Sequence, residues 1–326
     1  AYGILHVLQA LHSVLPPDKA YFKIIPKGDM IQLFPNENQK MNLLKIQLQL
    51  GLSRSLHFLH ISDTHLSYAD HRDTKRKQML AKQRRKLFGM EKDDISLRCL
   101  REAITYVKQH CDLLLHTGDL IDFISVQNLE IVQQELIDID YFCTAGNHEF
   151  SLYVGECREN SAYKRQNKPF VQPAFRNDLL FASRQLHGVN LVAVDNSYYR
   201  FTLQQLTALK NEVAKGLPIL LMLHIPLHTD SLYQEMLTKH HQECAYLIGT
   251  PAKLQLSYPA IRREQQKTTP ATEEFIRYVR QEKQIRAILT GHLHFDYNYI
   301  GAFSPTATQY VAGANFHSSA IEFELI

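Results

Sequence analysis

Histidines, carboxylates and an asparagine follow directly after short apolar runs at five places in this chain. They lie in Asp63-Thr64-His65, Gly118-Asp119, Gly146-Asn147-His148-Glu149, Leu223-His224 and Gly291-His292-Leu293-His294. Carboxylate oxygens and imidazole nitrogens suit Mn²⁺, Fe²⁺ or Zn²⁺, whereas soft-metal chemistry favours thiolates. These motifs offer enough side chains to hold two ions. The pattern therefore predicts a centre for two divalent metals.

The apolar runs that precede these motifs are typical of buried strands. Each run is short and rich in Leu, Ile, Val or Phe. The candidate strands are 56–61, 112–115, 141–144, 191–194, 219–223 and 287–290. In an open α/β sheet the ligand site lies beyond the carboxyl ends of the strands. Side chains that are far apart in the sequence are therefore expected to converge at one edge.

Segments with a helical period lie between these strands. Apolar residues recur at steps of three and four in 97–107, 129–139 and 203–209, as they do in helices with one buried face. Thr269 and Pro270 have the types preferred at the N-cap and first position of a further helix. The alternation of strands and helices predicts an α/β domain.

Composition and charge narrow the class of protein. The chain has 326 residues, 45% of them hydrophobic, so it can bury a large core. A net charge of +3 gives no general case for nucleic acid or an anionic membrane. The five cysteines form no C-x-x-C pair, so a reducing, cytoplasmic compartment is expected. Residues 4–15 are too few and too polar to span a bilayer and are expected to form an amphipathic helix, although a start at Ala1 leaves room for a removed leader.

Three segments interrupt the α/β alternation. Residues 1–52 form an N-terminal extension, expected to contain a helix followed by short strands, with no assigned role. Residues 66–93 and 225–268 are insertions of the length that lids and binding loops have. The first insertion carries eight basic residues between positions 72 and 86 against the single acid Asp73. This run is either a solvated helix face or a lid that guides anions.

The five motifs, taken in order, resemble those of the calcineurin-like metallophosphoesterases. The match to D-x-H, G-D-x-x-D, G-N-H-[ED], H and G-H-x-H covers roughly residues 56–300. The resemblance implies a four-layer α/β/β/α sandwich of two mixed sheets flanked by helices, in a domain that spans residues 53–326. The strand and helix pattern is compatible with this fold but does not distinguish it from other α/β layouts.

The resemblance also implies roles for individual residues. Asp63, His65 and His294 correspond to ligands of a first metal, Asn147, His224 and His292 to ligands of a second, and Asp119 to the carboxylate between them. His148 corresponds to a histidine that protonates the leaving group or stabilises the transition state, and Asp122 to the carboxylate that orients it. His224 is preferred over His228 because it directly ends the apolar run 219–223.

Position 122 and the residue after it differ from two branches of the superfamily. Purple acid phosphatases place an iron-binding tyrosine where this chain has Asp122, so a ferric centre is not expected. Protein Ser/Thr phosphatases follow that aspartate with an arginine that grips phosphate, whereas Phe123 follows here. A phosphomonoester dianion benefits most from such a bidentate clamp. Its absence favours diesters, as does the resemblance of residues 118–122 to the cyclic-nucleotide-phosphodiesterase-like branch, although an insertion could still supply an arginine.

We therefore expect a phosphodiesterase in which a hydroxide bridging two metals attacks phosphorus in line. The sequence contains neither a G-x-S-x-G elbow nor a Walker-type loop, so no serine nucleophile or P-loop is indicated. Alternatives are a phosphomonoesterase or nuclease of the same fold, and a metal-binding scaffold without catalysis, which the presence of His148 and Asp122 disfavours. The expected partner is a small-molecule or nucleotide phosphoester. Neither the substrate-binding residues nor the oligomeric state is indicated.

Overall fold

The computed structural model describes most of the chain. The described residues are 21–24, 30–33, 41–91, 93–155, 160–240, 247–256 and 258–326. The helix predicted at residues 4–15 lies outside these ranges.

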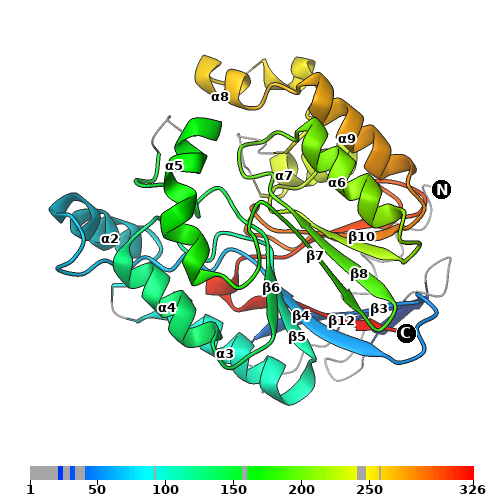
Figure 1. The fold of residues 1–326 in the computed structure, drawn as a ribbon, viewed down its shortest axis with the longest axis horizontal. Coiled ribbons are helices and arrows are strands. Elements are labelled where there is room, and N and C mark those ends of the chain that lie inside the picture. Colours follow the sequence, from blue (N-terminus) through cyan, green and yellow to red (C-terminus); the bar gives the residue numbers. More distant parts are fainter. Residues whose placement is uncertain are drawn as a thin grey trace.

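Two β-sheets form the centre of the molecule (Figure 1). One has seven strands in the order β1-β2-β3-β12-β4-β5-β6, and the other has five in the order β11-β10-β9-β8-β7. The strands are β1 (Tyr21–Ile24), β2 (Met30–Leu33), β3 (Asn42–Leu48), β4 (Leu56–Ile61), β5 (Leu113–His116), β6 (Tyr141–Cys143), β7 (Phe181–Leu186), β8 (Val189–Val194), β9 (Ile219–Met222), β10 (Ile285–Thr290), β11 (Thr308–Val311) and β12 (Ser319–Leu325). Both sheets are mixed. In the first, β12 runs antiparallel to β4 and parallel to β3, and in the second, β7 runs antiparallel to β8 while β8 runs parallel to β9.

Helices cover the outer face of each sheet. The α-helices are α2 (Lys75–Leu87), α3 (Ile95–His110), α4 (Val126–Leu136), α5 (Ser161–Val171), α6 (Leu203–Val213), α7 (Asp230–Thr238), α8 (Ala260–Gln265) and α9 (Pro270–Gln281), with short 3-10 turns at Gln172–Ala174, Ala252–Gln255 and Asn315–His317. Helices α3 and α4 pack on the seven-stranded sheet, and α6 and α9 on the five-stranded one (Figure 1). The predicted four-layer α/β/β/α sandwich is confirmed.

The alternation of side chains along each strand builds the layers. Successive residues of a strand point to opposite faces, so Phe58 of β4 enters the core between the sheets, where its ring stacks on Phe323 at 5.1 Å. The next residue, Leu59, points the other way and packs with Leu100 of α3. Burial on both faces explains why these strands are nearly continuous apolar runs.

Part of the predicted N-terminal extension belongs to the first sheet. Strand β3 pairs in parallel with β12 along its whole length, from Asn42 opposite Ser319 to Leu48 opposite Leu325. Strand β2 in turn pairs with β3. The division at residue 52 stays a prediction, but residues 42–48 share the hydrogen bonding of the sheet that carries β4.

The parallel strands bring their carboxyl ends to one side of the molecule. Strands β4, β5 and β6 are parallel neighbours in one sheet, and β8, β9, β10 and β11 are parallel neighbours in the other. The five motifs follow β4, β5, β6, β9 and β10. Both sheets therefore contribute loops to the same edge, as the strand-end rule predicts.

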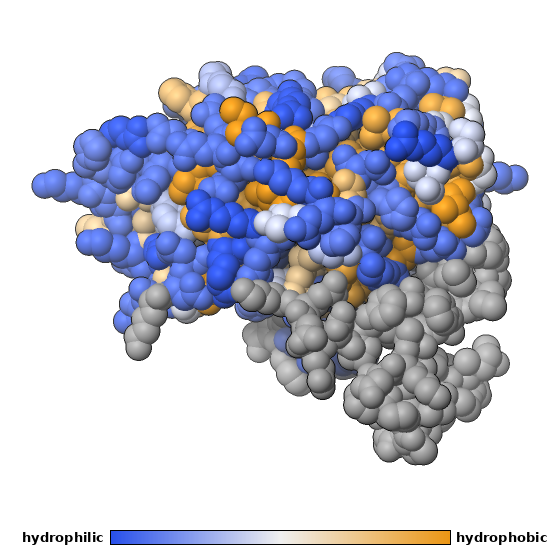
Figure 2. Space-filling view, turned by 90° about the horizontal axis from the view of Figure 1, so that it is seen from below, coloured by the Kyte–Doolittle hydropathy of each residue, from blue (hydrophilic) through white to orange (hydrophobic). Residues whose placement is uncertain are grey.

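Hydrophilic residues dominate the face of the molecule shown in Figure 2, where apolar residues gather in small areas between them. Among the helices that the structure describes, none combines the length and the apolar character needed to cross a bilayer. Cys99, Cys111 and Cys143 are free thiols.

Candidate metal centre

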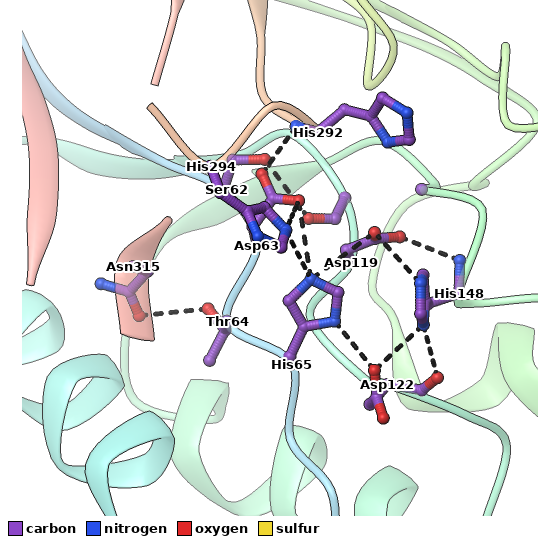
Figure 3. Close-up of polar contacts among 12 residues, drawn as sticks. Ser62, Asp63, Thr64, His65, Asp119, Asp122, His148, His292, His294 and Asn315 are labelled. Carbon is purple, nitrogen blue, oxygen red and sulfur yellow. Dashed lines mark hydrogen bonds and ion pairs between the residues drawn. The ribbon is translucent and has the colours of Figure 1, made fainter. Parts of the chain in front are cut away.

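The seven predicted ligand residues lie together at the edge where the two sheets meet. Figure 3 shows Asp63, His65, Asp119, His292 and His294 among them. Loops after the first sheet's strands carry Asp63, His65, Asp119 and Asn147, and loops after the second sheet's strands carry His224, His292 and His294. Most of these side chains are buried, whereas the side chain of His294 is 35% exposed. The site is therefore built from both sheets and opens to solvent beside His294.

The first cluster consists of Asp63, His65 and His294. The Nε2 atoms of the two histidines lie 3.1 Å apart, and they lie 3.7 Å (His65) and 3.4 Å (His294) from Asp63 Oδ1. His65 Nε2 is also 3.8 Å from Asp119 Oδ2. Donor atoms bound to one ion at about 2.1 Å lie about 3.0–3.4 Å from one another. The spacing is close to that of a ligand set around one ion.

The second cluster consists of Asp119, Asn147, His224 and His292. His224 Nε2 lies 3.2 Å from Asp119 Oδ2, 3.1 Å from Asn147 Oδ1 and 3.2 Å from His292 Nδ1. Asp119 Oδ2 therefore faces both clusters, since the same atom is 3.8 Å from His65 Nε2. This arrangement suits a carboxylate that lies between two ions.

Hydrogen bonds behind the centre fix which nitrogen each histidine presents. His65 Nδ1 donates to Asp122 Oδ1 at 3.0 Å, and His224 Nδ1 donates to the carbonyl of Thr117 at 2.7 Å. Both acceptors lack a proton of their own, so each Nδ1 carries a hydrogen and Nε2 is the nitrogen that each ring presents to the centre. His292 differs, because its Nε2 lies 3.3 Å from the hydroxyl of Tyr199 and its Nδ1 faces His224.

One buried atom is placed to bind a cation. Asp63 Oδ1 is inaccessible to solvent and accepts no hydrogen bond from any residue that the structure describes, although the Nε2 atoms of His65 and His294 lie 3.7 and 3.4 Å away. Burial by itself raises the pKa of Asp63, but the neighbouring imidazoles of His294 and His65 hold that pKa well below its usual range, so the carboxylate is charged. A buried carboxylate oxygen without a donor is costly unless it binds a cation. The donor set of imidazole, carboxylate and amide groups fits Mn²⁺, Fe²⁺ or Zn²⁺.

The backbone of the motifs is held in an uncommon conformation. Five residues of the centre have positive φ: Asp63 (55°), His65 (51°), Asp119 (55°), His292 (71°) and His294 (60°). Left-handed conformations are costly for residues with a Cβ and persist where the surrounding structure imposes them. The loops therefore turn sharply enough to aim alternate side chains of Asp63-Thr64-His65 and His292-Leu293-His294 at the same place.

Glycines allow the loops to approach one another closely. A Cβ on Gly146 would overlap the side chain and backbone nitrogen of Asp119, and a Cβ on Gly291 would overlap Ser62. Gly118 has both a positive φ of 97° and the backbone of Gly146 against it. Gly118 therefore combines a sharp turn with close backbone approach, while at the other two the close approach is decisive.

His148 lies beside the two clusters and contacts Asp122. Its Nδ1 donates to the carbonyl oxygen of Asp122 at 2.7 Å and lies 3.1 Å from Asp122 Oδ1, while its Nε2 lies 3.8 Å from Asp119 Oδ2 (Figure 3). Burial alone would lower the pKa of His148, but the charge of Asp119 and the hydrogen bond to Asp122 raise it to about 10. His148 Nε2 therefore faces the centre and carries a proton in the metal-free protein.

Sequence reasoning did not single out Arg84, which also contacts Asp122. Arg84 belongs to the basic insertion and donates from Nε to Asp122 Oδ2 at 2.6 Å and from Nη2 to Oδ1 at 2.8 Å. The run of basic residues carried no signal that would distinguish this arginine from its neighbours. His228, the rejected alternative to His224, packs against Tyr233 at 5.7 Å instead.

Glu149 binds the backbone of two loops that carry residues of the centre. Its carboxylate is fully buried and accepts hydrogen bonds from the backbone nitrogens of Asp119, Leu120, Ile121 and Gly146 at 2.6–3.2 Å. These contacts are those of a structural residue. Glu149 joins the loops after β5 and β6 and so fixes the backbone of Asp119.

The chain matches the family model described as calcineurin-like phosphoesterase over residues 56–296, which is more than half of its length. The chain belongs to the calcineurin-like phosphoesterase family. It is therefore a metal-dependent phosphoric ester hydrolase, in accordance with the histidine and carboxylate groups of the centre. A comparison with curated protein sequences finds no match.

Solved structures with a similar fold include three phosphoesterases. A dimetal phosphatase from Danio rerio is 14% identical, with a TM-score of 0.48, over 80% of this chain and 88% of the other. A calcineurin-like phosphoesterase from Bacillus subtilis is 11% identical, with a TM-score of 0.43, over 80% of this chain and 82% of the other. A 5'-nucleotidase from Candida albicans is 15% identical, with a TM-score of 0.38, over 82% of this chain and 47% of the other. With TM-scores below 0.5 and such low identity, these likenesses carry no statement about the activity or the substrate of this chain.

Proposed function

We propose that this calcineurin-like phosphoesterase is a phosphodiesterase with two divalent ions at the edge shared by the two sheets. Asp63, His65 and His294 would hold the first ion, Asn147, His224 and His292 the second, and Asp119 would lie between them. When bound, two such ions supply Lewis-acid stabilisation of the phosphoryl oxygens and lower the pKa of a water between them. The chain's own residues then have to orient the ester and supply a proton to the leaving oxygen.

His148 is the proposed proton donor. Its Nδ1 is occupied by the carbonyl of Asp122, so Nε2 is the atom that faces Asp119 and the side on which the ester would bind. The two hydrogen-bond acceptors of Asp122, its carbonyl and its carboxylate, hold the imidazole ring in this orientation. A general acid in this position protonates the leaving oxygen as its negative charge develops and contributes about 10²–10⁴-fold to the rate.

The preference for diesters rests on the hydrogen bonds that Arg84 already makes to Asp122. This arginine lies against the centre, but Nε and Nη2 are both engaged with the carboxylate of Asp122. A fork that is already bonded to a carboxylate is not free to grip a dianion through the same two groups. A diester carries one negative charge and needs such a clamp less than a monoester does.

A cavity beside the centre has room for a second ester group. It measures about 1360 Å³ and extends from His148 and His292 past α5 to α8. This volume exceeds what a phosphate group fills, and ligand sites commonly measure about 300–1,000 Å³. Basic residues outnumber acids along its wall: Arg84, Lys164, Arg165, Lys168, Arg200 and Arg262 against Asp195 and Glu264, outside Asp119. A small-molecule or nucleotide ester with further negative charge fits such a wall.

The test compares two chromogenic esters in the Mn²⁺-loaded protein. We expect kcat/KM for bis-p-nitrophenyl phosphate to exceed that for p-nitrophenyl phosphate by at least about tenfold, which corresponds to about 1.4 kcal/mol of transition-state preference. The Asp119→Asn variant, prepared in the same way, controls for contaminating hydrolases. Faster hydrolysis of the monoester would contradict the proposal and favour a phosphomonoesterase, and cleavage of an oligonucleotide in preference to both would favour a nuclease.

A further inference from the structure

An arginine from the first insertion forms an ion pair with Asp122. The side chain of Asp122 is fully buried and that of Arg84 is 16% exposed, so their ion pair is largely shielded from water. Two near-parallel hydrogen bonds, at 2.6 and 2.8 Å, join the guanidinium to the two carboxylate oxygens. Such bidentate pairing fixes the plane of a carboxylate as well as its distance.

Both oxygens of this carboxylate contact Arg84, but only Oδ1 also contacts histidines. Oδ1 contacts the Nδ1 atoms of both His65, at 3.0 Å, and His148, at 3.1 Å. Oδ2 accepts its hydrogen bond from Arg84. The terminal torsion of an aspartate has a broad energy profile, so the histidine contacts at Oδ1 leave the carboxylate able to turn. The pair with Arg84, which engages both oxygens, opposes this rotation.

We propose that Arg84 is a positioning residue, which locks the carboxylate of Asp122 so that this carboxylate can orient His148. The insertion at residues 66–93 is then part of the catalytic apparatus, although it carries none of the predicted ligands. This inference rests on the proposed function to the extent that it assigns proton donation to His148.

Helix α2 is held in a way that suits this role. Arg85, the next residue, pairs with Asp94 beyond the helix and donates to the carbonyl of Met90. Phe88, just after the helix, lies 4.6 Å from the Arg84 guanidinium and 5.2 Å from the ring of His65. Contacts of Arg85 and Phe88 therefore hold the last turn of α2, which carries Arg84, in place. This helix lines the centre on the side of Asp122.

A direct contact between Arg84 and substrate is the main alternative. The guanidinium has five N–H groups, and two of them are used on Asp122. Arg84 also lines the cavity beside the centre, so the remaining groups could reach a phosphoryl oxygen. The two roles differ in what they require of His148. A positioning residue acts through that imidazole, whereas a substrate contact acts without it.

The test is a double-mutant cycle between Arg84 and His148 in the Mn²⁺-loaded protein. Because loss of an outer partner commonly costs about 10–100-fold in activity, we expect Arg84→Met to lower kcat by at least about tenfold with little change in KM. Arg84→Lys, which keeps the charge but not the fork, should fall between the parent and Arg84→Met. In a His148→Ala background, Arg84→Met should lower kcat no further, since the group through which it acts is gone. Lys82→Met controls for the same loss of charge from the exposed side of α2.

Bound metal and inhibition by inorganic phosphate complete the measurement. We expect both to stay at the parental level in Arg84→Met. An equal loss of kcat with and without His148 would overturn the proposal, and so would a large rise in KM and in the phosphate inhibition constant at constant kcat. The cycle is run on whichever chromogenic ester the parent hydrolyses faster. A preference for the monoester would therefore contradict the proposed diester activity and leave the positioning role of Arg84 to be decided by the cycle.

Discussion

At the residue scale, the roles of Asp119 and His148 are separable although their side chains lie 3.8 Å apart. Asp119 Oδ2 faces both ligand clusters, so Asp119→Asn should lose metal and activity together. His148 donates to Asp122 and its imidazole belongs to neither proposed ligand set. His148→Ala should therefore retain two metals per chain and lose about 10²-fold or more in kcat. Metal analysis of the two purified variants checks this, and metal loss from His148→Ala would assign that histidine to the ligands.

Metal affinity should depend on pH through His224. Burial alone would lower the pKa of His224, but the neighbouring charge of Asp119 raises it to about 9 in the metal-free protein. A metal must displace this proton, so affinity for Mn²⁺ should rise with pH between about 6 and 9, by up to tenfold per unit for each proton released. Calorimetric titration in buffers of different ionisation enthalpy measures the released proton directly. A binding constant that is flat across this range would show that His224 does not bind the ion.

The residues of the centre were predictable because strand ends place them. Each motif follows an apolar run, and the rule that ligand sites lie beyond carboxyl ends brings the side chains together. Arg84 was not predictable in the same way. Helix α2 has a single buried residue, Ala81, so the spacing of its apolar residues does not indicate which side of the helix faces the centre. The contact of Phe88 with His65 fixes that orientation, and it exists only in the folded chain.

At the element scale, the loop after β6 must approach the loop after β5 without a side chain in between. Gly146→Ala would place a Cβ into the side chain and backbone nitrogen of Asp119. We expect this variant to fold but to lose at least one metal per chain, because Asp119 must move. Gly216→Ala is the control. An alanine at its φ of 80° costs about 1–2 kcal/mol of unfolding free energy, but the space around this position is open, so the new Cβ displaces no other residue. Equal metal content in both variants would contradict the close-approach argument.

Helix α5 should contribute charge to substrate binding. Arg165 lines the cavity, is exposed, and forms no ion pair with any residue for which the structure gives a position. Arg165→Gln should raise KM for an anionic diester by up to about fivefold, with a smaller effect at high salt, because an exposed pair contributes about 0.2–1 kcal/mol. Lys108→Gln removes an exposed charge from α3 and should leave KM unchanged. Steady-state kinetics at two ionic strengths compare the variants, and identical KM values would remove α5 from the binding surface.

The sequence predicted the strands that carry motifs better than those that do not. The run at 56–61 coincides with β4, and the run at 219–223 exceeds β9 by one residue. Strand β12 was not found, because Glu322 and Glu324 interrupt its apolar pattern. Glu322 is nevertheless buried, since it pairs with Lys45 and accepts from the hydroxyl of Tyr106. A local sequence pattern does not identify this central strand, because the residues that neutralise the charge of Glu322 lie far from it in the sequence.

At the scale of the whole molecule, the centre joins two sheets that otherwise meet through an apolar core. Asp63, His65, Asp119 and Asn147 come from the seven-stranded sheet, and His224, His292 and His294 from the five-stranded one. The proposed first ion would bind His294 across from Asp63, and the second would bind His224 and His292 across from Asn147. Each ion would therefore bridge the sheets, which requires the sandwich to be assembled before either site exists.

Anomalous diffraction from crystals grown with Mn²⁺ is the decisive experiment for the dinuclear centre. We expect two peaks about 3.5–4 Å apart, one bonded to Asp63, His65 and His294 and the other to Asn147, His224 and His292. Asp119 should contact both ions, and His148 should contact neither. A single peak, or two peaks with Asp119 bound to only one of them, would contradict the proposed dinuclear centre.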